Sequence, residues 1–104
     1  MSYVYLVQET GKHNFSSARK FGEIKTLLPF GYQVGLDIDF ATQKIHEGLE
    51  EIERGDFLLL AGDPALIGMT VAIAADYLDG QVSLLKWDRQ EKFYIPIHCS
   101  LYGD

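Results

Sequence analysis

Apolar blocks alternate along this chain with polar or glycine-containing segments, at the spacing of short strands and helices. Residues 3–7 (Tyr-Val-Tyr-Leu-Val) are continuously apolar and β-prone, which predicts a strand that is buried on both faces. A polar loop follows at residues 9–12. Residues 14–35 carry no clear period: residues 17–28 fit either a short helix or an irregular hairpin, and a proline and two glycines interrupt residues 29–35.

A helical period then begins near Asp37 or Asp39, either of which can cap a helix. Its apolar positions fall on one stripe, and they are Phe40, Ala41, Ile45, Leu49 and Ile52. Charged residues up to Arg54 occupy the opposite side, so we expect an amphipathic surface helix with Gly55 at its left-handed C-cap. Residues 57–61 (Phe-Leu-Leu-Leu-Ala) predict a short buried strand, and a helix followed by a buried strand favours a parallel sheet.

A second helix is predicted from Pro64 to about Leu78, because Gly62 supplies a tight turn, Asp63 an N-cap and Pro64 a preorganised first helical residue. Its apolar residues surround the helix axis. One stripe can cover the sheet, and it comprises Leu66, Ile67, Val71, Ala74 and Leu78. A second row comprises Met69, Ile73 and Tyr77. We expect this row to be buried by the N-terminal segment, by residues 14–35, or by a two-fold partner.

The C-terminal third predicts two strands joined by a polar turn. Residues 82–87 complete a β-α-β unit, residues 88–92 form the turn, and residues 93–97 return as an antiparallel strand. Pro96 places that last strand at a sheet edge, because proline donates no hydrogen bond to a neighbouring strand. The predicted fold class is therefore α/β: a single domain over residues 1–104 with a small mixed sheet, a β-α-β unit, two main helices and a C-terminal antiparallel hairpin.

Composition supports an ordinary globular domain, with 47% hydrophobic and 23% charged residues. Cys99 is the only thiol, and the start of the chain lacks the pattern of a signal peptide, so we expect a cytoplasmic protein. The longest apolar stretch, residues 65–75, is too short to span a bilayer. A formal net charge of −6 weighs against direct binding to nucleic-acid backbones.

The most site-like feature is the turn at Gly62 and Asp63, because open α/β sheets bind ligands at the carboxyl ends of their strands. The turn lacks the spaced glycines of a dinucleotide-binding loop and the Lys-Ser/Thr of a P-loop, and Asp63 would repel a phosphate. A weak ligand-binding site and a plain helix cap both remain open. No cofactor is predicted.

No catalytic or metal site is predicted. The three histidines are scattered, and none has a metal-ligating residue at the required spacing. His98 and Cys99 are neighbours, but adjacent residues of a strand point to opposite faces and do not readily share a hydrogen bond. We therefore expect a protein that is not an enzyme, with a packed thiol at Cys99.

Three surfaces are candidates for binding a protein partner. Glu47, Glu50 and Glu51 form an acidic strip on the first helix that suits a basic partner, although such a strip is commonly just a solvated helix face. Trp87 and Arg89 combine an aromatic and a cationic side chain, as interface hot spots do. The second-helix row Met69, Ile73 and Tyr77, together with small residues elsewhere on that helix, would fit a homodimer seam.

Residues 55–68 (Gly-Asp-Phe-Leu-Leu-Leu-Ala-Gly-Asp-Pro-Ala-Leu-Ile-Gly), followed by residues 84–89 (Leu-Leu-Lys-Trp-Asp-Arg) and 94–97 (Tyr-Ile-Pro-Ile), resemble parts of small uncharacterised proteins encoded by tailed bacteriophages, marine ones especially. The resemblance covers roughly the C-terminal half and involves packing and turn residues. It implies a phage protein made in the cytoplasm of a bacterial host, and it assigns no functional residues.

These observations favour a non-enzymatic phage accessory protein that binds a host or phage macromolecule, with a homodimer among the expected states. An alternative is a small-molecule or nucleotide-binding α/β domain whose site lies at Gly62 and Asp63. A virion component is a further alternative. The sequence alone does not choose among the three.

Overall fold

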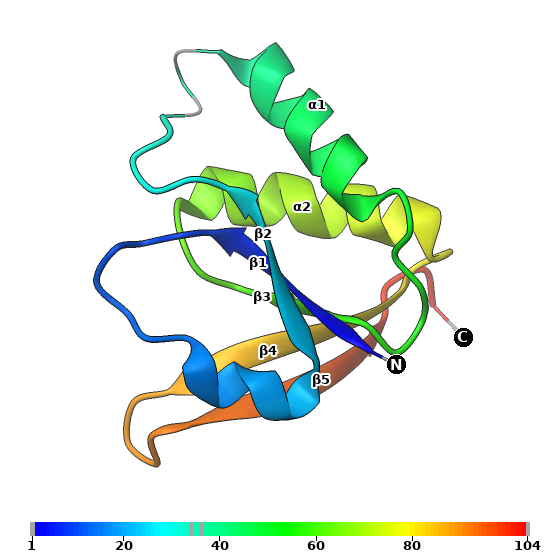
Figure 1. Cartoon of the computed structure of the whole chain (residues 1–104). Coiled ribbons are helices and arrows are strands. Elements are labelled where there is room, and N and C mark those ends of the chain that lie inside the picture. The colour runs from blue at the N-terminus through cyan, green and yellow to red at the C-terminus, as the bar shows by residue number, and fades with distance from the viewer. Residues whose placement is uncertain (1, 34, 36, 104) are drawn as a thin grey trace.

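The computed structural model describes residues 2–33, 35 and 37–103, and it confirms the predicted α/β class (Figure 1). The elements follow in the order β1 (Tyr3–Gln8), a 3-10 helix η1 (Ser16–Phe21), β2 (Glu23–Leu28), α1 (Ile38–Leu49), β3 (Phe57–Leu59), α2 (Pro64–Tyr77), β4 (Gln81–Asp88) and β5 (Phe93–Ser100). No helix in the described part of the chain is both long and apolar enough to cross a membrane.

The strands form one five-stranded sheet in the order β2-β1-β3-β4-β5. The first four strands are parallel, and β5 runs antiparallel to β4, with Pro96 opposite Leu85. The β-α-β unit and the C-terminal hairpin predicted from the sequence are therefore present, and Pro96 does lie in an edge strand. The chain leaves β1 toward β2 on one side and leaves β3 toward β4 on the other, so the direction of winding reverses between β1 and β3.

Helices cover both faces of the sheet, which explains the buried residues 4–7 of β1. Helices α1 and α2 lie side by side on one face, and η1 lies on the other (Figure 1). The α1–α2 side packs a core that includes Tyr5, Val7, Ile45, Leu58 and Leu66. The η1 side packs a second core of Val4, Leu6, Phe15, Ala18, Leu59, Leu85 and Tyr94. Because successive residues of a strand alternate in direction, β1 supplies both cores.

The first helix is shorter than its sequence pattern predicts. Asp37 caps it, and its side chain accepts a hydrogen bond from the Phe40 amide at 3.0 Å. Ala41, Ile45 and Leu49 are buried as expected, but Phe40 is 41% exposed. The helix ends at Leu49, so the prediction that Gly55 caps it was wrong; Gly55 adopts a positive φ of 98° in the connection to β3.

Helix α2 begins and ends where the sequence predicts. Pro64 is in its first turn, and the Asp63 carboxylate accepts a hydrogen bond from the Ala65 amide at 2.7 Å. In its second apolar row, Met69 and Ile73 are half-buried against the larger core, while Tyr77 is 44% exposed and contacts His46 of α1. Tyr77 thus lies beside α1, a neighbour that the sequence pattern did not predict.

The ambiguous segment resolves into a helical turn followed by a strand in its described residues, 14–33 and 35. Residues 16–21 form η1, and residues 23–28 form the edge strand β2, parallel to β1. Neither a single helix over residues 17–28 nor an irregular hairpin is present. The local pattern misled because β2 is an edge strand whose exposed residues break the apolar alternation.

Two glycines of the β3–α2 region should respond oppositely to alanine. Gly62 has a φ of 112°, and a Cβ there would lie 2.4 Å from the Gln8 Cβ, whereas a Cβ on helical Gly68 would meet nothing within 4 Å. We expect Gly62→Ala to lower the free energy of unfolding by about 2 kcal/mol or more, and Gly68→Ala to raise it by about 0.5–1 kcal/mol. Urea denaturation of both variants measures this, and shifts of the same sign would contradict it.

Candidate functional site

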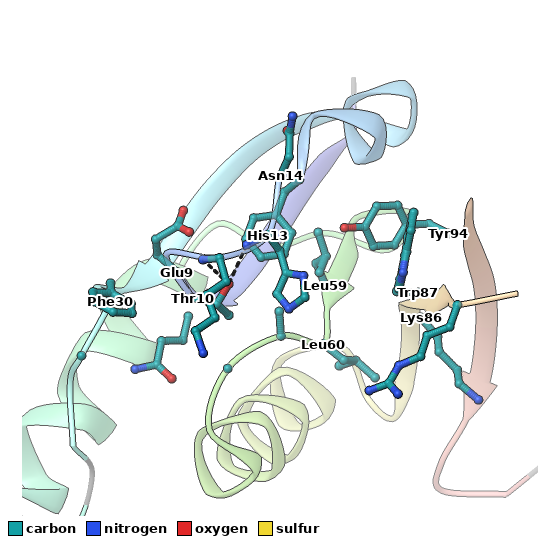
Figure 2. A pocket seen from close by; sticks show the side chains of 17 residues that line it. Glu9, Thr10, His13, Asn14, Phe30, Leu59, Leu60, Lys86, Trp87 and Tyr94 are labelled. Carbon is teal, nitrogen blue, oxygen red and sulfur yellow. Dashed lines mark hydrogen bonds between the residues drawn. The ribbon is translucent and has the colours of Figure 1, made fainter. Parts of the chain in front are cut away.

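A cleft of about 730 Å³ opens at the carboxyl edge of the parallel strands, where the winding direction reverses (Figure 2). Its walls come from the ends of β1, β3 and β4, from the loops that follow these strands and β2, and from Tyr94 of β5. This edge of an open α/β sheet commonly holds a ligand, because the loops diverge there and leave a crevice. The volume lies within the range of small-molecule sites.

Gln8, the last residue of β1, fixes the floor of this cleft. Its side-chain amide Nε2 donates to the carbonyl oxygens of Pro29 at 3.3 Å and Tyr32 at 3.0 Å, and its Oε1 accepts from the amide of Asp63 at 2.8 Å. The residue is only 6% exposed, so each of these bonds replaces water that the folded chain excludes. One side chain thereby ties the loop after β2 to the start of α2.

The loop after β1 takes its shape from side chains that bond its own backbone. Thr10 Oγ1 accepts from the His13 amide at 3.3 Å and the Lys12 amide at 3.5 Å, and Glu9 Oε1 accepts from the Gly11 amide at 3.0 Å. Phe30 packs on Gly11, where a Cβ would lie 2.9 Å from the phenyl ring. These contacts hold the exposed side chains of Lys12 and His13 at the cleft.

An aromatic pair forms the opposite wall. Trp87 and Tyr94 meet edge to face, with ring centroids 4.9 Å apart and an interplanar angle of 62°. Tyr94 is 5% exposed, and burial raises the pKa of its phenol above the ordinary 10.0, so it is neutral at physiological pH. Trp87 is 40% exposed. Figure 2 shows Trp87 and Tyr94 on the side of the cleft opposite Glu9, Thr10 and Phe30.

The charge of the cleft is opposite to that of the whole chain. The sequence has 9 basic and 15 acidic residues, yet the described residues that line the cleft include three cations (Lys12, Lys86 and Arg89) and one carboxylate (Glu9). Within the described ranges the single ion pair is Lys44–Glu47, so none of the three cations lies within 4.0 Å of a carboxylate. The cleft therefore combines unpaired positive charge with an aromatic wall.

The structure brings together only some of the residues that the sequence singled out. Gly62, Trp87 and Arg89 line the cleft, whereas the Asp63 carboxylate caps α2 and its amide is bound by Gln8. The acidic strip lies on and just after α1, and the second apolar row lies on α2, both outside the cleft lining.

Sequence reasoning missed Gln8, Lys12 and Tyr94 as site residues, and it considered Lys86 only beside Trp87 and Arg89 as part of a partner-binding surface. A signal existed for Gln8 alone: a lone amide that ends an otherwise apolar strand must find partners at the sheet edge. Lys12 and Tyr94 carried no comparable local signal.

Other reactive side chains lie apart from the cleft. Ser83 Oγ and His98 Nδ1 are 2.8 Å apart on the η1 side of the sheet, where His98 also contacts the Phe57 ring. Cys99 packs against the core on the other side, as the alternation of a strand requires. Among residues 2–33, 35 and 37–103, no group of three or more metal-ligating side chains is arranged to hold an ion.

Comparison with known protein families identifies a relationship. A family model described as "Phage Pam3 gp32-like protein" matches residues 2–101, which is nearly the whole chain. No curated protein matches the chain, and no solved structure does.

Replacing Gln8 should disrupt the cleft and the fold together. Gln8→Leu keeps the side-chain volume but leaves the Asp63 amide and the Pro29 and Tyr32 carbonyls without their partner. We expect a loss of about 2–4 kcal/mol in the free energy of unfolding. The control is Gln43→Leu on the exposed side of α1, where the single bond to Glu47 should be worth less than about 0.5 kcal/mol. Equal urea midpoints for the two variants would contradict the role given to Gln8.

Proposed function

This chain belongs to the phage Pam3 gp32-like protein family, and from that premise we propose that it is a non-enzymatic binding protein that holds a small anionic molecule in its carboxyl-edge cleft. The observation that carries the proposal is the set of three unpaired cations, Lys12, Lys86 and Arg89, around a cleft of about 730 Å³ in an otherwise acidic chain. We propose the bacterial host cytoplasm as its location.

Electrostatics support an anion as the ligand. A cleft lined by one sign of charge concentrates ions of the other sign, because its low-dielectric walls focus the field. Three of the six basic residues outside the cleft are engaged: Lys44 pairs with Glu47, and Lys20 and Lys25 each lie over an aromatic ring. Lys12, Lys86 and Arg89 have no such described contact, so their donors are available to a ligand.

The hydrogen bonds of the cleft support binding in preference to turnover. The described bonds of Gln8, Glu9, Thr10 and Asn14 all join a side chain to the backbone and serve to shape the loops. A nucleophile would need a base held within hydrogen-bond reach. The described pairs of that kind, Ser83 with His98 and Tyr77 with His46, both lie outside the cleft lining.

A second candidate function is binding of a macromolecule, in the first instance a second copy of this chain. The observation in its favour is an exposed apolar group on and after the edge strand, which we call the β5 surface and which comprises Phe93, Ile97, Leu101 and Tyr102. Exposed large apolar side chains can mark an interface, and the same residues of two copies can meet about a two-fold axis. For a basic partner, the exposed carboxylates Glu47, Glu50 and Glu51 remain the proposed contact.

Arg89 should contribute directly to anion affinity. We expect Arg89→Gln to weaken the binding of inorganic pyrophosphate roughly tenfold, since a charge-assisted hydrogen bond is lost. Lys92→Gln is the matched control, because it removes the same charge from the same turn outside the cleft lining. Isothermal titration calorimetry at low ionic strength measures both. Equal affinities in the two variants, or no binding by the native chain, would refute the proposed site.

The homodimer is tested by sedimentation equilibrium across a range of concentrations. If the β5 surface forms the two-fold contact, Ile97→Lys should yield a folded monomer, while Tyr77→Lys on α2 should leave the dimer intact. The reverse pattern would move the contact to the α2 row of Met69, Ile73 and Tyr77. A native chain that stays monomeric at every concentration would remove the second candidate function.

A further inference from the structure

We infer that the small anion is a nucleoside phosphate, whose base stacks on Trp87 and whose phosphate is held by Arg89, Lys86 and Lys12. This inference rests on the proposed function and names its ligand class. It combines two features of one cleft, an exposed indole and a group of unpaired cations. An anion without an aromatic ring would interact only with the cations.

Trp87 is built as a stacking platform. The buried Tyr94 supports its ring edge to face at 4.9 Å, which fixes the indole before any ligand arrives. With 40% of its surface exposed, the indole retains open area at the cleft wall. Every nucleobase has a π face that can cover such a surface, and fixing the platform in advance reduces the entropy lost on binding.

Side chains are proposed to bind the phosphate because amides at the N-terminus of α2 already have hydrogen-bond partners. The Asp63 amide donates to Gln8, the Ala65 amide donates to the Asp63 carboxylate, and that carboxylate would itself repel an anion. The usual phosphate site of such folds, the helix N-terminus, is therefore closed here. Flexible cationic side chains on the β1 loop and at the end of β4 replace it.

Polar groups on the loop after β1 are placed to form hydrogen bonds with the sugar and with the edge of the base. Thr10 accepts two backbone bonds through Oγ1, which leaves its hydroxyl hydrogen free to donate. Asn14 accepts from the Ser16 amide through Oδ1, which leaves its NH₂ group free. Figure 2 shows Thr10, His13 and Asn14 on the loop that faces the Trp87 wall. A few placed polar groups beside apolar area are typical of specific ligand sites.

A free nucleotide fits better than a polynucleotide. The net charge of −6 lies largely outside the cleft, so a long phosphate backbone that left the cleft would meet an acidic surface. A single nucleotide places all its charge beside the three cations. The test must therefore distinguish the binding of a free nucleotide from the binding of single-stranded nucleic acid.

The test compares ribose 5-phosphate with adenosine 5′-monophosphate, which differ only in the base. Trp87 is the single tryptophan, so its fluorescence, excited at the red edge of the indole band, reports directly on stacking. We expect the nucleotide to bind roughly tenfold or more tightly than the sugar phosphate, and to quench Trp87 where the sugar phosphate does not. By calorimetry, Trp87→Leu should reduce nucleotide affinity to that of ribose 5-phosphate, whose own binding stays unchanged and shows that the variant is folded.

Each other result has a distinct meaning. Equal affinity for the two ligands with no change in fluorescence would overturn the nucleotide inference and leave the proposed anion site standing. No binding of either ligand by the native chain would overturn both. A single-stranded adenine oligonucleotide that binds more tightly than the mononucleotide, and that quenches Trp87, would overturn the assignment to a free nucleotide. Should Trp87→Leu fail to fold, Trp87→Phe replaces it, with a partial loss of nucleotide affinity expected.

Discussion

The hydrogen bonds of the Gln8 side chain are the constraint on which the carboxyl edge of this protein depends. Strand β1 pairs with β2 on one side and β3 on the other, and Gln8 at its end bonds the segments that follow both neighbours. Gly62 must lack a side chain because Gln8 occupies the space where a Cβ would stand. The loop after β2 and the start of α2 are thus held together by a buried amide that cannot move without losing three bonds.

This bonding also directs where an anion can be recognised. An open N-terminus on α2 would have offered backbone amides to a phosphate, but Gln8 and Asp63 use those amides for the fold. Positive charge therefore has to come from side chains that project from separate segments, Lys12 after β1 and Lys86 and Arg89 at the end of β4. Such side chains adapt to a ligand more readily than a backbone loop does, at the cost of ordering them.

Burial of β1 on both faces accounts for much of the remaining architecture. A strand that is apolar on both faces must be covered on both faces of the sheet. On one face the short helix η1 is sufficient, because Phe15 and Ala18 fill the second core. On the other face, α1 and α2 share the sheet and contact each other, as His46 and Tyr77 illustrate. A helix that touches both a sheet and a second helix needs apolar residues on more than one side, which explains the broad apolar surface of α2.

The sequence by itself determined the elements whose signals lie within a few residues of one another. Asp63 and Pro64 start α2, the polar turn and Pro96 define an edge hairpin, and the α/β class follows from the order of the blocks. Tertiary structure decided what meets at the carboxyl edge, since Gln8 bonds residues that are 21, 24 and 55 positions away. Gly62, Trp87 and Arg89 were singled out one by one, and the parallel pairing of β3 with β4 places them at one edge. The pairing of β3 with β1 adds Gln8 and the loop that carries Lys12 to the same cleft. Local pattern records how a segment satisfies its own backbone, whereas a site between loops depends on which strands become neighbours.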